Sequence, residues 1–336
     1  MKSLISLIFL LALLAAAIFL YAVFFMPNIN AEKRMAIKIP TGSNYKDMLR
    51  ILSENKVLKS DYTFSLVGKL KHFHQVKPGY YVFSRNMNNR QIVNMLQMGL
   101  QTPVTLVVYN IRTKEEFAGL VGRTLEIDSN VFLAKLNSDT FCSRYKLDTD
   151  NILSRFIVDN YDLYWNTSLQ KFLAKQEDAY NSFWNAERLA NAAAIHLSPT
   201  QVTTLASIVE KEVIHDKELP TVAGVYLNRL KIGMPLQADP TLVFALRDFE
   251  ARRVNSRHKQ YDSPFNTYLH AGLPPGPICM PRKKSIDAVL NAETHQYLYF
   301  CASPDMSGYS LFTKTYEEQI QNAAKYRKKL DELNVH

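Results

Sequence analysis

The chain has 336 residues, of which 47% are hydrophobic and 21% are charged, and its net charge is +9. This length suits two modest domains better than one small domain, and the composition is that of a globular rather than a disordered protein. The positive charge would suit nucleic acid, an anionic membrane surface or an anionic polymer, and an ordinary soluble basic surface explains it equally well. No RNA-binding, zinc-finger or basic-helix pattern supports binding to nucleic acid.

The N-terminus carries a long apolar segment. Residues 4–25 contain no charged side chain, and at 1.5 Å per residue they match a hydrocarbon core of about 30 Å. The apolar region of a cleaved signal peptide runs only about 7–15 residues, whereas this one continues past Ala17 into Ile18. We therefore predict a retained transmembrane helix, and Lys2 before it favours a cytoplasmic start.

Two strand–helix units follow a polar tether. Residues 36–40 are expected to form a strand and residues 45–58 a helix, because their apolar residues have helical spacing. A similar strand at 105–111 precedes a second helix, with Thr113 and Glu116 as a capping box. This pattern indicates a weak internal repeat, although two unrelated pairs explain it nearly as well. A strand–helix–helix–strand module of this type is a plausible polysaccharide-binding fold.

Between and after these units, further elements are predicted. Residues 77–83 read as a strand, and the helix at 88–99 is expected to end at Gly99. Residues 130–195 are predicted to be mostly helical, with Trp165 and Trp184 as packing anchors.

The C-terminal part begins with a helix that starts at Ser198, with Pro199 in its first turn. Beyond Gly233 the chain becomes rich in Pro, Gly and aromatic residues, which is typical of rigid loops that line a substrate groove. The last helix is expected from Thr315, in a capping box with Glu318, to about residue 333.

The cysteines and histidines do not form a metal site in the sequence pattern. The chain has three cysteines, Cys142, Cys279 and Cys301, and none of them are in a CxxC spacing. We therefore expect buried apolar thiols, and one disulfide between an unspecified pair remains an alternative. His72 and His74 read as a surface pair. Neither a metal nor a cofactor is predicted.

The remaining chemistry is that of carboxylates. The chain contains no GxSxG, HExxH, Walker or GxGxxG motif. On a helical wheel of residues 203–213, Glu212 falls within the apolar face formed by Leu205 and Ile208, whereas Glu210 falls outside it. Apolar surroundings would raise the pKa of Glu212 and suit it to act as a general acid. A charged helix end in water is the alternative interpretation.

Several motifs occur together in a fixed order. They read LASIVEKE at 205–212, VAGVYLNRLKIGMPLQADPT at 222–241, SPFNTYLHAGLPPGPI at 263–278 and YLYFCA at 297–302. These segments resemble the endolytic lytic transglycosylases of bacterial cell-wall metabolism, the MltG/YceG-like family. The resemblance extends back through NYDLYWNTS and KPGYYVF to the membrane anchor, so it covers nearly the whole chain.

The resemblance implies an α+β protein of the cell inner membrane, with a single transmembrane helix and the bulk of the chain in the periplasm. Such enzymes cut the MurNAc–GlcNAc β-1,4 bond within nascent peptidoglycan strands and leave 1,6-anhydroMurNAc ends, which terminates elongation beside the peptidoglycan synthases. A LysM-like α/β module precedes a mixed α/β catalytic domain with Pro/Gly-rich groove loops. The predicted parts are a cytoplasmic stub at 1–3, the transmembrane helix at 4–25, a tether at 26–35, the LysM-like module at 36–100, a strand–helix unit with a helical connector at 101–196, and the catalytic domain at 197–336.

The resemblance also implies roles for individual residues. Glu212 matches the catalytic glutamate, with Glu210 as the fallback, and it would protonate the glycosidic oxygen before accepting the proton of the sugar's C6 hydroxyl. Five polar residues in the matching loops are expected to bind sugar and peptide groups or to hold the shape of the groove: Asn228, Gln237, Asp239, Asn266 and Tyr268. A simple turn at Asp239 and a loop cap at Asn266 remain equally open.

The sequence departs from the family pattern at four places. Val213 follows the catalytic glutamate where a small residue is usual, and Arg282 stands where a glycine is expected. Two family histidines are replaced by Ser310 and Gln319. Two other functions stay open: a two-carboxylate muramidase with Asp239 as the second group, and a membrane-anchored peptidoglycan-binding scaffold without activity.

Overall fold

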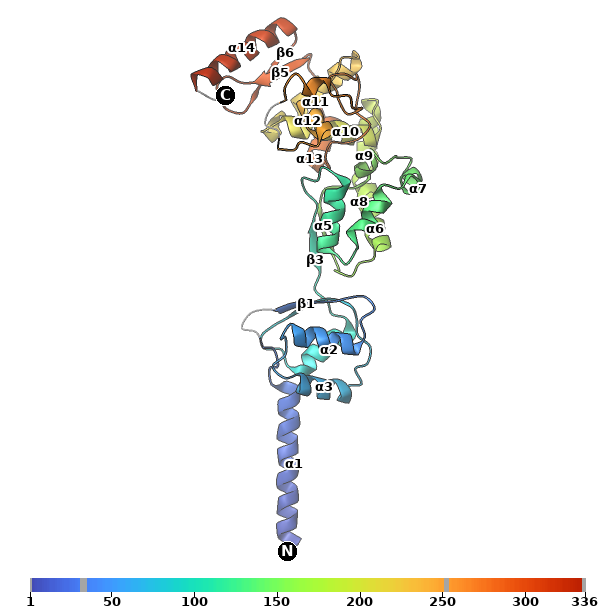
Figure 1. Cartoon of the computed structure of the whole chain (residues 1–336), viewed down its shortest axis with the longest axis vertical. Helices are drawn as coiled ribbons and strands as arrows, with labels where there is room; N and C mark the ends of the chain where they lie inside the picture. The colour runs from blue at the N-terminus through green and yellow to red at the C-terminus, as the bar shows by residue number, and fades with distance from the viewer. Residues whose placement is uncertain (1, 31–34, 251–253, 334–336) are drawn as a thin grey trace. The chain divides into compact units, whose positions relative to one another are not determined.

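The structure is a computed structural model that describes residues 2–30, 35–250 and 254–333. Parts of the predicted stub, tether and C-terminal end therefore lie outside the described residues. The chain is a mixed α/β protein with an N-terminal apolar helix (Figure 1). It forms two compact units, and the first consists of residues 1–106, 121–127 and 161–168. The second consists of residues 107–120, 128–160 and 169–336.

The first unit is built on an antiparallel strand pair flanked by helices. Its elements are α1 (Lys2–Phe25), β1 (Met35–Ile39), α2 (Tyr45–Glu54), α3 (Asp61–Leu70), β2 (Gly79–Phe83) and α4 (Asn89–Met98). The strand register runs from Met35 opposite Phe83 to Ile39 opposite Gly79. Alternation along both strands buries Ile37, Ile39, Tyr81 and Phe83 on one face. The predicted strands are confirmed, and α4 ends before Gly99, whose φ is +72°.

Helix α1 continues into the core of the first unit at its C-terminal end. Residues Leu4–Phe25 form an apolar helix of mean hydropathy 2.9, which is compatible with a single-pass membrane anchor. Near its end, α1 contacts α3 and α4 (Figure 1). The Nδ2 of Asn89 donates to the carbonyl of Val23 at 2.8 Å, and its Oδ1 accepts from Asn28 at 2.6 Å. The first bond satisfies a backbone carbonyl that the helix end would otherwise leave unpaired, and the second joins the two asparagine side chains.

The second strand–helix pair follows the first along the sequence, as the sequence pattern predicted. Strand β3 (Val104–Val107) pairs with β4 (Asn160–Leu163), and α5 (Lys114–Thr124) follows β3. The predicted capping box is half correct. Thr113 Oγ1 accepts from the Glu116 backbone at 3.1 Å, but the Glu116 carboxylate accepts from the backbone of Arg112 instead. Strand β4 interrupts residues 130–195, which were predicted to be mostly helical. The sequence pattern did not indicate this strand, because a four-residue strand depends on a partner far away in sequence.

The second unit packs around helix α10. The elements of this unit that follow α5 in the chain, α10 included, are α6 (Ser129–Leu136), α7 (Asp139–Cys142), α8 (Leu169–Phe183), α9 (Ala186–Ala194), α10 (Pro199–Glu212), α11 (Leu219–Lys231), α12 (Asp239–Leu246), α13 (Lys283–Leu290), β5 (Tyr299–Ala302), β6 (Ser310–Thr313) and α14 (Tyr316–Glu332). Short 3₁₀ turns lie at Ser143–Tyr145, Ile152–Arg155, Asp216–Glu218 and His258–Gln260.

The predicted starts of two helices are confirmed in this unit. Ser198 and Gln201 form a capping box at α10, with Pro199 in the first turn, and Thr315 and Glu318 cap α14. Residues 202–209 of α10 are buried on all sides, because α9, α11, α12 and α13 pack around it. Strands β5 and β6 pair antiparallel and contact α14 (Figure 1).

The predicted packing roles of the aromatic and sulfur residues hold. Trp165 and Trp184 are buried in the first and the second unit respectively. All three cysteines are free thiols; Cys142 and Cys279 are buried, and Cys301 is half-buried.

The Pro-rich segment 273–282 lies against α10 along one side. Ser207 Oγ accepts from the backbone of Ile278 at 3.0 Å, and the backbone of Met280 donates to the carbonyl of Ile111 at 2.7 Å. At Gly276 the segment passes so close to another loop that an added Cβ would lie 2.1 Å from the carbonyl oxygen of Asp150. The segment is therefore held as a rigid wall beside the C-terminal half of α10.

This close approach gives a testable prediction. Gly276→Ala should destabilise the second unit by about 2 kcal/mol or more, because backbone atoms must move to admit the methyl group. Gly272→Ala is the matched control: Gly272 has a φ of +92° but open space around its Cβ, so backbone strain alone should cost about 1 kcal/mol. Differential scanning calorimetry of the two variants compares them, and equal midpoints would contradict the close approach.

Candidate active site

Glu212 is the last residue of α10 and lies at the edge of the second unit's core. The residues one and two turns before it are fully buried, whereas Glu212 keeps an intermediate exposure. Val213 is extended, so the backbone leaves the helix directly after the carboxylate. The helix thus carries Glu212 along the apolar core to a cavity that it lines. The helical wheel predicted the inward direction of this side chain but not the cavity.

The surroundings of Glu212 favour its protonated form. Burial, with a smaller contribution from the nearby carboxylate of Asp239, raises the pKa of Glu212 to a net value of about 7. Two smaller effects lower the pKa: a hydrogen bond from Tyr226 and the positive charge of Arg229. A carboxyl group with a pKa near 7 can both give and take a proton at neutral pH.

Tyr226 and Arg229 lie three residues apart on α11 and were not singled out in the sequence. The hydroxyl of Tyr226 donates to Glu212 Oε1 at 3.0 Å, and the tyrosine is only 1% exposed. Burial and the Glu212 charge hold the pKa of Tyr226 well above its usual range, so it remains a donor. The Arg229 guanidinium donates to the carbonyls of Leu298 and Leu236 at 2.7 and 2.6 Å. The sequence signal that could have identified Tyr226 and Arg229 is their i, i+3 spacing within the 222–241 motif, which places both on one face of a helix.

A cavity of about 430 Å³ opens beside Glu212, and Asp239 lines it. The hydroxyl of Tyr268 donates to Asp239 Oδ1 at 2.5 Å. Burial and this carboxylate raise the pKa of Tyr268. The structure therefore brings together three of the predicted residues: Glu212, Asp239 and Tyr268.

The other predicted residues hold loops near the site. Asn266 is fully buried, and its side chain bonds the carbonyls of Lys259 and Tyr261 and the backbone of Tyr268. Asn228 donates to the carbonyls of His295 and Tyr297 at 2.9 and 3.0 Å. Asn228 Nδ2 also lies 3.5 Å from His295 Nδ1. Both amides thus bond mainly to backbone groups of neighbouring loops, so their contribution here is to the shape of the loops.

Gln237 is exposed and adopts a left-handed backbone, with a φ of +51°. Such a conformation is uncommon for a residue with a side chain. The loop holds it with a hydrogen bond from its backbone to the carbonyl of Thr267 at 3.0 Å.

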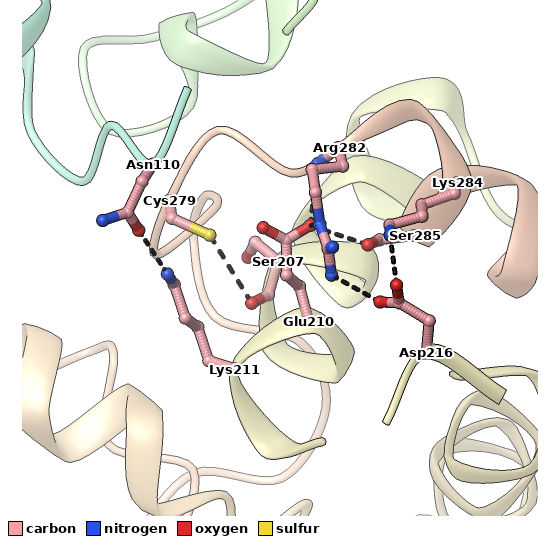
Figure 2. A network of polar contacts seen from close by, with 9 residues as sticks. All are labelled: Asn110, Ser207, Glu210, Lys211, Asp216, Cys279, Arg282, Lys284 and Ser285. Atoms are coloured by element: carbon pink, nitrogen blue, oxygen red, sulfur yellow. Dashed lines mark hydrogen bonds and ion pairs between the residues drawn. The ribbon is translucent and has the colours of Figure 1, made fainter. Parts of the chain in front are cut away.

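Glu210, the fallback catalyst, is also buried, although the wheel placed it outside the apolar face. Its side chain is 8% exposed, and it accepts hydrogen bonds from the backbone of Arg282 at 2.7 Å and from Ser285 at 2.6 Å (Figure 2). Arg282 in turn bonds Asp216 at 2.9 Å, and Lys284 pairs with the same carboxylate (Figure 2). A polar network around the start of α13 thus takes the place of water for this carboxylate.

Glu212 also lines a second cavity of about 430 Å³, on the side of strands β5 and β6. The residues around it are uncharged apart from Glu212, and they include Ile214, Phe300, Cys301 and Tyr326. The carboxyl group therefore borders two hollows of different character. One contains charged side chains, and the other offers apolar and neutral polar groups.

Comparison with known proteins shows the family of this chain. The model of the YceG-like family matches residues 37–325. The chain belongs to the YceG-like family. The family predicted from the sequence motifs is thereby confirmed.

Two relatives of this YceG-like chain carry a functional name. It is 28% identical to the endolytic murein transglycosylase of Bacillus subtilis strain 168, over 94% of this chain and 91% of that protein. It is 25% identical to the endolytic murein transglycosylase of Streptococcus pneumoniae serotype 2, over 88% of this chain but only 59% of that protein. A crystal structure of a YceG-like protein of Listeria monocytogenes matches with a TM-score of 0.59 and 27% identity, over 87% of this chain and 99% of that one.

The raised pKa of Glu212 predicts a dependence of stability on pH. The unfolded carboxyl has a pKa near 4.5 and the folded one near 7, so the folded state binds more protons between these values. The contribution of Glu212 to stability is therefore greatest below about pH 4.5 and falls as the pH rises through 7, by about 3 kcal/mol in total. Glu212→Gln removes this loss, and its stability relative to the wild type should grow by that amount between pH 4 and pH 8.

Denaturant unfolding at several pH values, followed by tryptophan fluorescence, measures this difference. Glu187→Gln is the control, because Glu187 is exposed on α9 and should leave the pH dependence unchanged. Parallel pH profiles for Glu212→Gln and the wild type would show that the folded carboxyl is not held protonated.

Proposed function

We propose that this chain is an endolytic peptidoglycan lytic transglycosylase. It cleaves the MurNAc–GlcNAc β-1,4 bond within nascent glycan strands, leaves 1,6-anhydroMurNAc ends and so terminates strand elongation. The names of the relatives support the reaction class. The observation that carries the proposal is the single carboxyl group of Glu212, with a pKa of about 7, on the border of two cavities.

The mechanism uses Glu212 twice. Protonated Glu212 gives its proton to the glycosidic oxygen as the bond from that oxygen to C1 of MurNAc breaks. The C6 hydroxyl of the same sugar then attacks C1, and the Glu212 carboxylate takes the hydroxyl proton. The acid is regenerated and no water is consumed. Intramolecular attack gains its rate from proximity, and one group can serve as acid and base because its pKa lies near neutral pH.

The neighbours of Glu212 support both steps. Tyr226 donates to the carboxyl at 3.0 Å and would orient it toward the glycosidic oxygen. Asp239, which accepts from Tyr268, supplies negative charge in the same cavity. Positive charge develops at C1 in the transition state, and a fixed carboxylate stabilises such charge.

The presence of Asp239 in the same cavity also favours one second candidate, a muramidase. In that reaction Asp239 would act as a nucleophile or base, and water would enter the product. The hydrogen bond from Tyr268 occupies one oxygen of Asp239 and weakens it as a nucleophile, which is why we place the lyase first. The alternative of a membrane-anchored scaffold without activity does not account for the raised pKa of Glu212.

The first unit supports a role in placing the enzyme. Its order β1–α2–α3–β2, with antiparallel strands, is what a LysM-like glycan-binding module would need. Helix α1 would anchor this module at the inner membrane, with the second unit in the periplasm near the peptidoglycan synthases. The pattern of charges offers no separate support for nucleic acid.

The products of glycan digestion test the proposal. Glu212→Gln should lower the rate of cleavage at least about 10³-fold, because it removes both the acid and the base. Mass spectrometry of the wild-type products should show muramic ends that are lighter by one water than reducing ends.

Two variants separate the alternatives. Glu210→Gln should retain cleavage to anhydro ends, with reduced thermal stability, because Glu210 bonds Arg282 and Ser285 rather than the cavity. Asp239→Asn should slow the reaction without changing the product. Reducing ends in the wild-type digest would instead establish the muramidase, and full activity of Glu212→Gln would exclude Glu212 as the catalyst.

A further inference from the structure

Two basic side chains line the cavity between Glu212 and Asp239 without a carboxylate partner. Arg112 and Lys211 are both half-buried there. Neither forms an ion pair with any carboxylate of residues 2–30, 35–250 and 254–333. Nearby cations differ: Arg282 and Lys284 are paired with acidic residues. Two unneutralised cations in a cavity indicate an anionic ligand.

Their positions leave donors free for such a ligand. Lys211 leaves α10 on the side away from the Glu210 network, and its Nζ donates to Asn110 at 2.7 Å (Figure 2). An ammonium group has three donors, so others remain. The Arg112 guanidinium lies 4.7 Å from the centre of the Phe249 ring, and one nitrogen bonds the carbonyl of that residue at 3.4 Å. Stacking on the ring fixes the plane of the guanidinium while other N–H groups stay available.

The charge balance of the cavity distinguishes it from the hollow on the other side of Glu212. With Glu212 protonated, the charged groups that line it are Arg112 and Lys211 against the single carboxylate of Asp239. The second cavity has no charged lining residue other than Glu212 among the described residues. An anionic group therefore has a favourable place on one side of the scissile bond and none on the other.

The substrate has a matching asymmetry. The sugars that flank a glycosidic bond in peptidoglycan alternate, and only the muramic acid bears a lactyl group, which ends in a carboxylate or in a peptide stem with carboxylates of its own. The N-acetylglucosamine carries no charge. Resting on the proposed function, we propose that Arg112 and Lys211 bind the carboxylate carried on the lactyl group of muramic acid.

This contact selects which of the two alternating bonds is cut. A strand with its muramic acid in the cation-lined cavity presents C1 of that sugar to Glu212, and the neutral glucosamine occupies the cavity beside β5 and β6. A strand shifted by one sugar would leave the cations unpaired and place a carboxylate against uncharged walls. Burying an unpaired carboxylate is unfavourable, so the shifted register is disfavoured. The peptide stem is the source we favour, because the lactyl carboxyl of a muramic acid that bears a stem is tied up in an amide bond and leaves the stem carboxylates as the anionic groups.

Defined glycan oligomers test this subsite. Three substrates are compared: oligomers with dipeptide stems that bear free carboxylates, the same oligomers with those carboxylates converted to amides, and stem-free oligomers with the lactyl carboxylate alone. The wild type should have a kcat/KM at least about tenfold higher for the free than for the amidated stems. In Arg112→Gln/Lys211→Gln this ratio should fall to about one. Lys284→Gln, which removes a cation outside the cavity, should keep the wild-type ratio.

The outcomes are distinct. If stem-free oligomers are preferred over both others, the subsite is confirmed with the lactyl carboxylate as its ligand. A wild type that cuts free and amidated stems equally without preferring stem-free oligomers, or a double variant that keeps the wild-type preference, overturns the subsite while leaving the transglycosylase intact. Titration calorimetry of the three oligomers with the Glu212→Gln variant measures their binding constants, and the preference among the oligomers should match the one seen in kcat/KM. A wild type that cuts none of them contradicts the proposed function, whereas the binding preference of Glu212→Gln still decides the subsite.

Discussion

The site depends on one constraint: a carboxyl group must be held at the end of a fully buried helix without losing its proton. Eight consecutive residues of α10, 202–209, are buried, so the helix cannot shift without disturbing the whole core. This rigidity lets the protein keep Glu212 in surroundings that are unfavourable to its charged form. The surrounding core contributes the free energy that offsets this cost, as is common where a functional group is placed at the expense of stability.

The polar network of Glu210 complements this arrangement on the other side of the helix. Glu210 fastens α10 to the start of α13, and Arg282 joins that point to Asp216, which lies in the segment directly after Glu212. The chain is thus held both before and after Glu212. The resemblance noted in the sequence predicts a glycine at the position of Arg282, and if that holds, the side-chain part of this clamp is particular to this chain. The backbone bond to Glu210 needs no particular side chain.

The sequence predicted those features that depend on local patterns. Apolar periodicity placed Glu212 on the inward face of α10, and turn chemistry located the capping residue Ser198. Tertiary features were missed, because the partners are distant in sequence. Lys211 sits beside Glu212 and reads as an ordinary surface lysine, and only the fold brings Arg112 to the same cavity. The burial of Glu210 was missed for the same reason, since its partners lie over seventy residues away.

A single carboxyl that acts as acid and then as base has to balance two demands. A higher pKa makes proton donation less favourable, and a lower pKa leaves too little of the protonated form at neutral pH. Tyr226 and Arg229 lower the pKa of Glu212, whereas burial and Asp239 raise it, and the result is about 7. In the proposed mechanism Asp239 would have two effects, since the same charge that helps to raise the pKa of Glu212 would also favour the positive sugar in the transition state. The unpaired cations lie in that same cavity, and an anionic substituent bound to them would neutralise their charge near the developing cation.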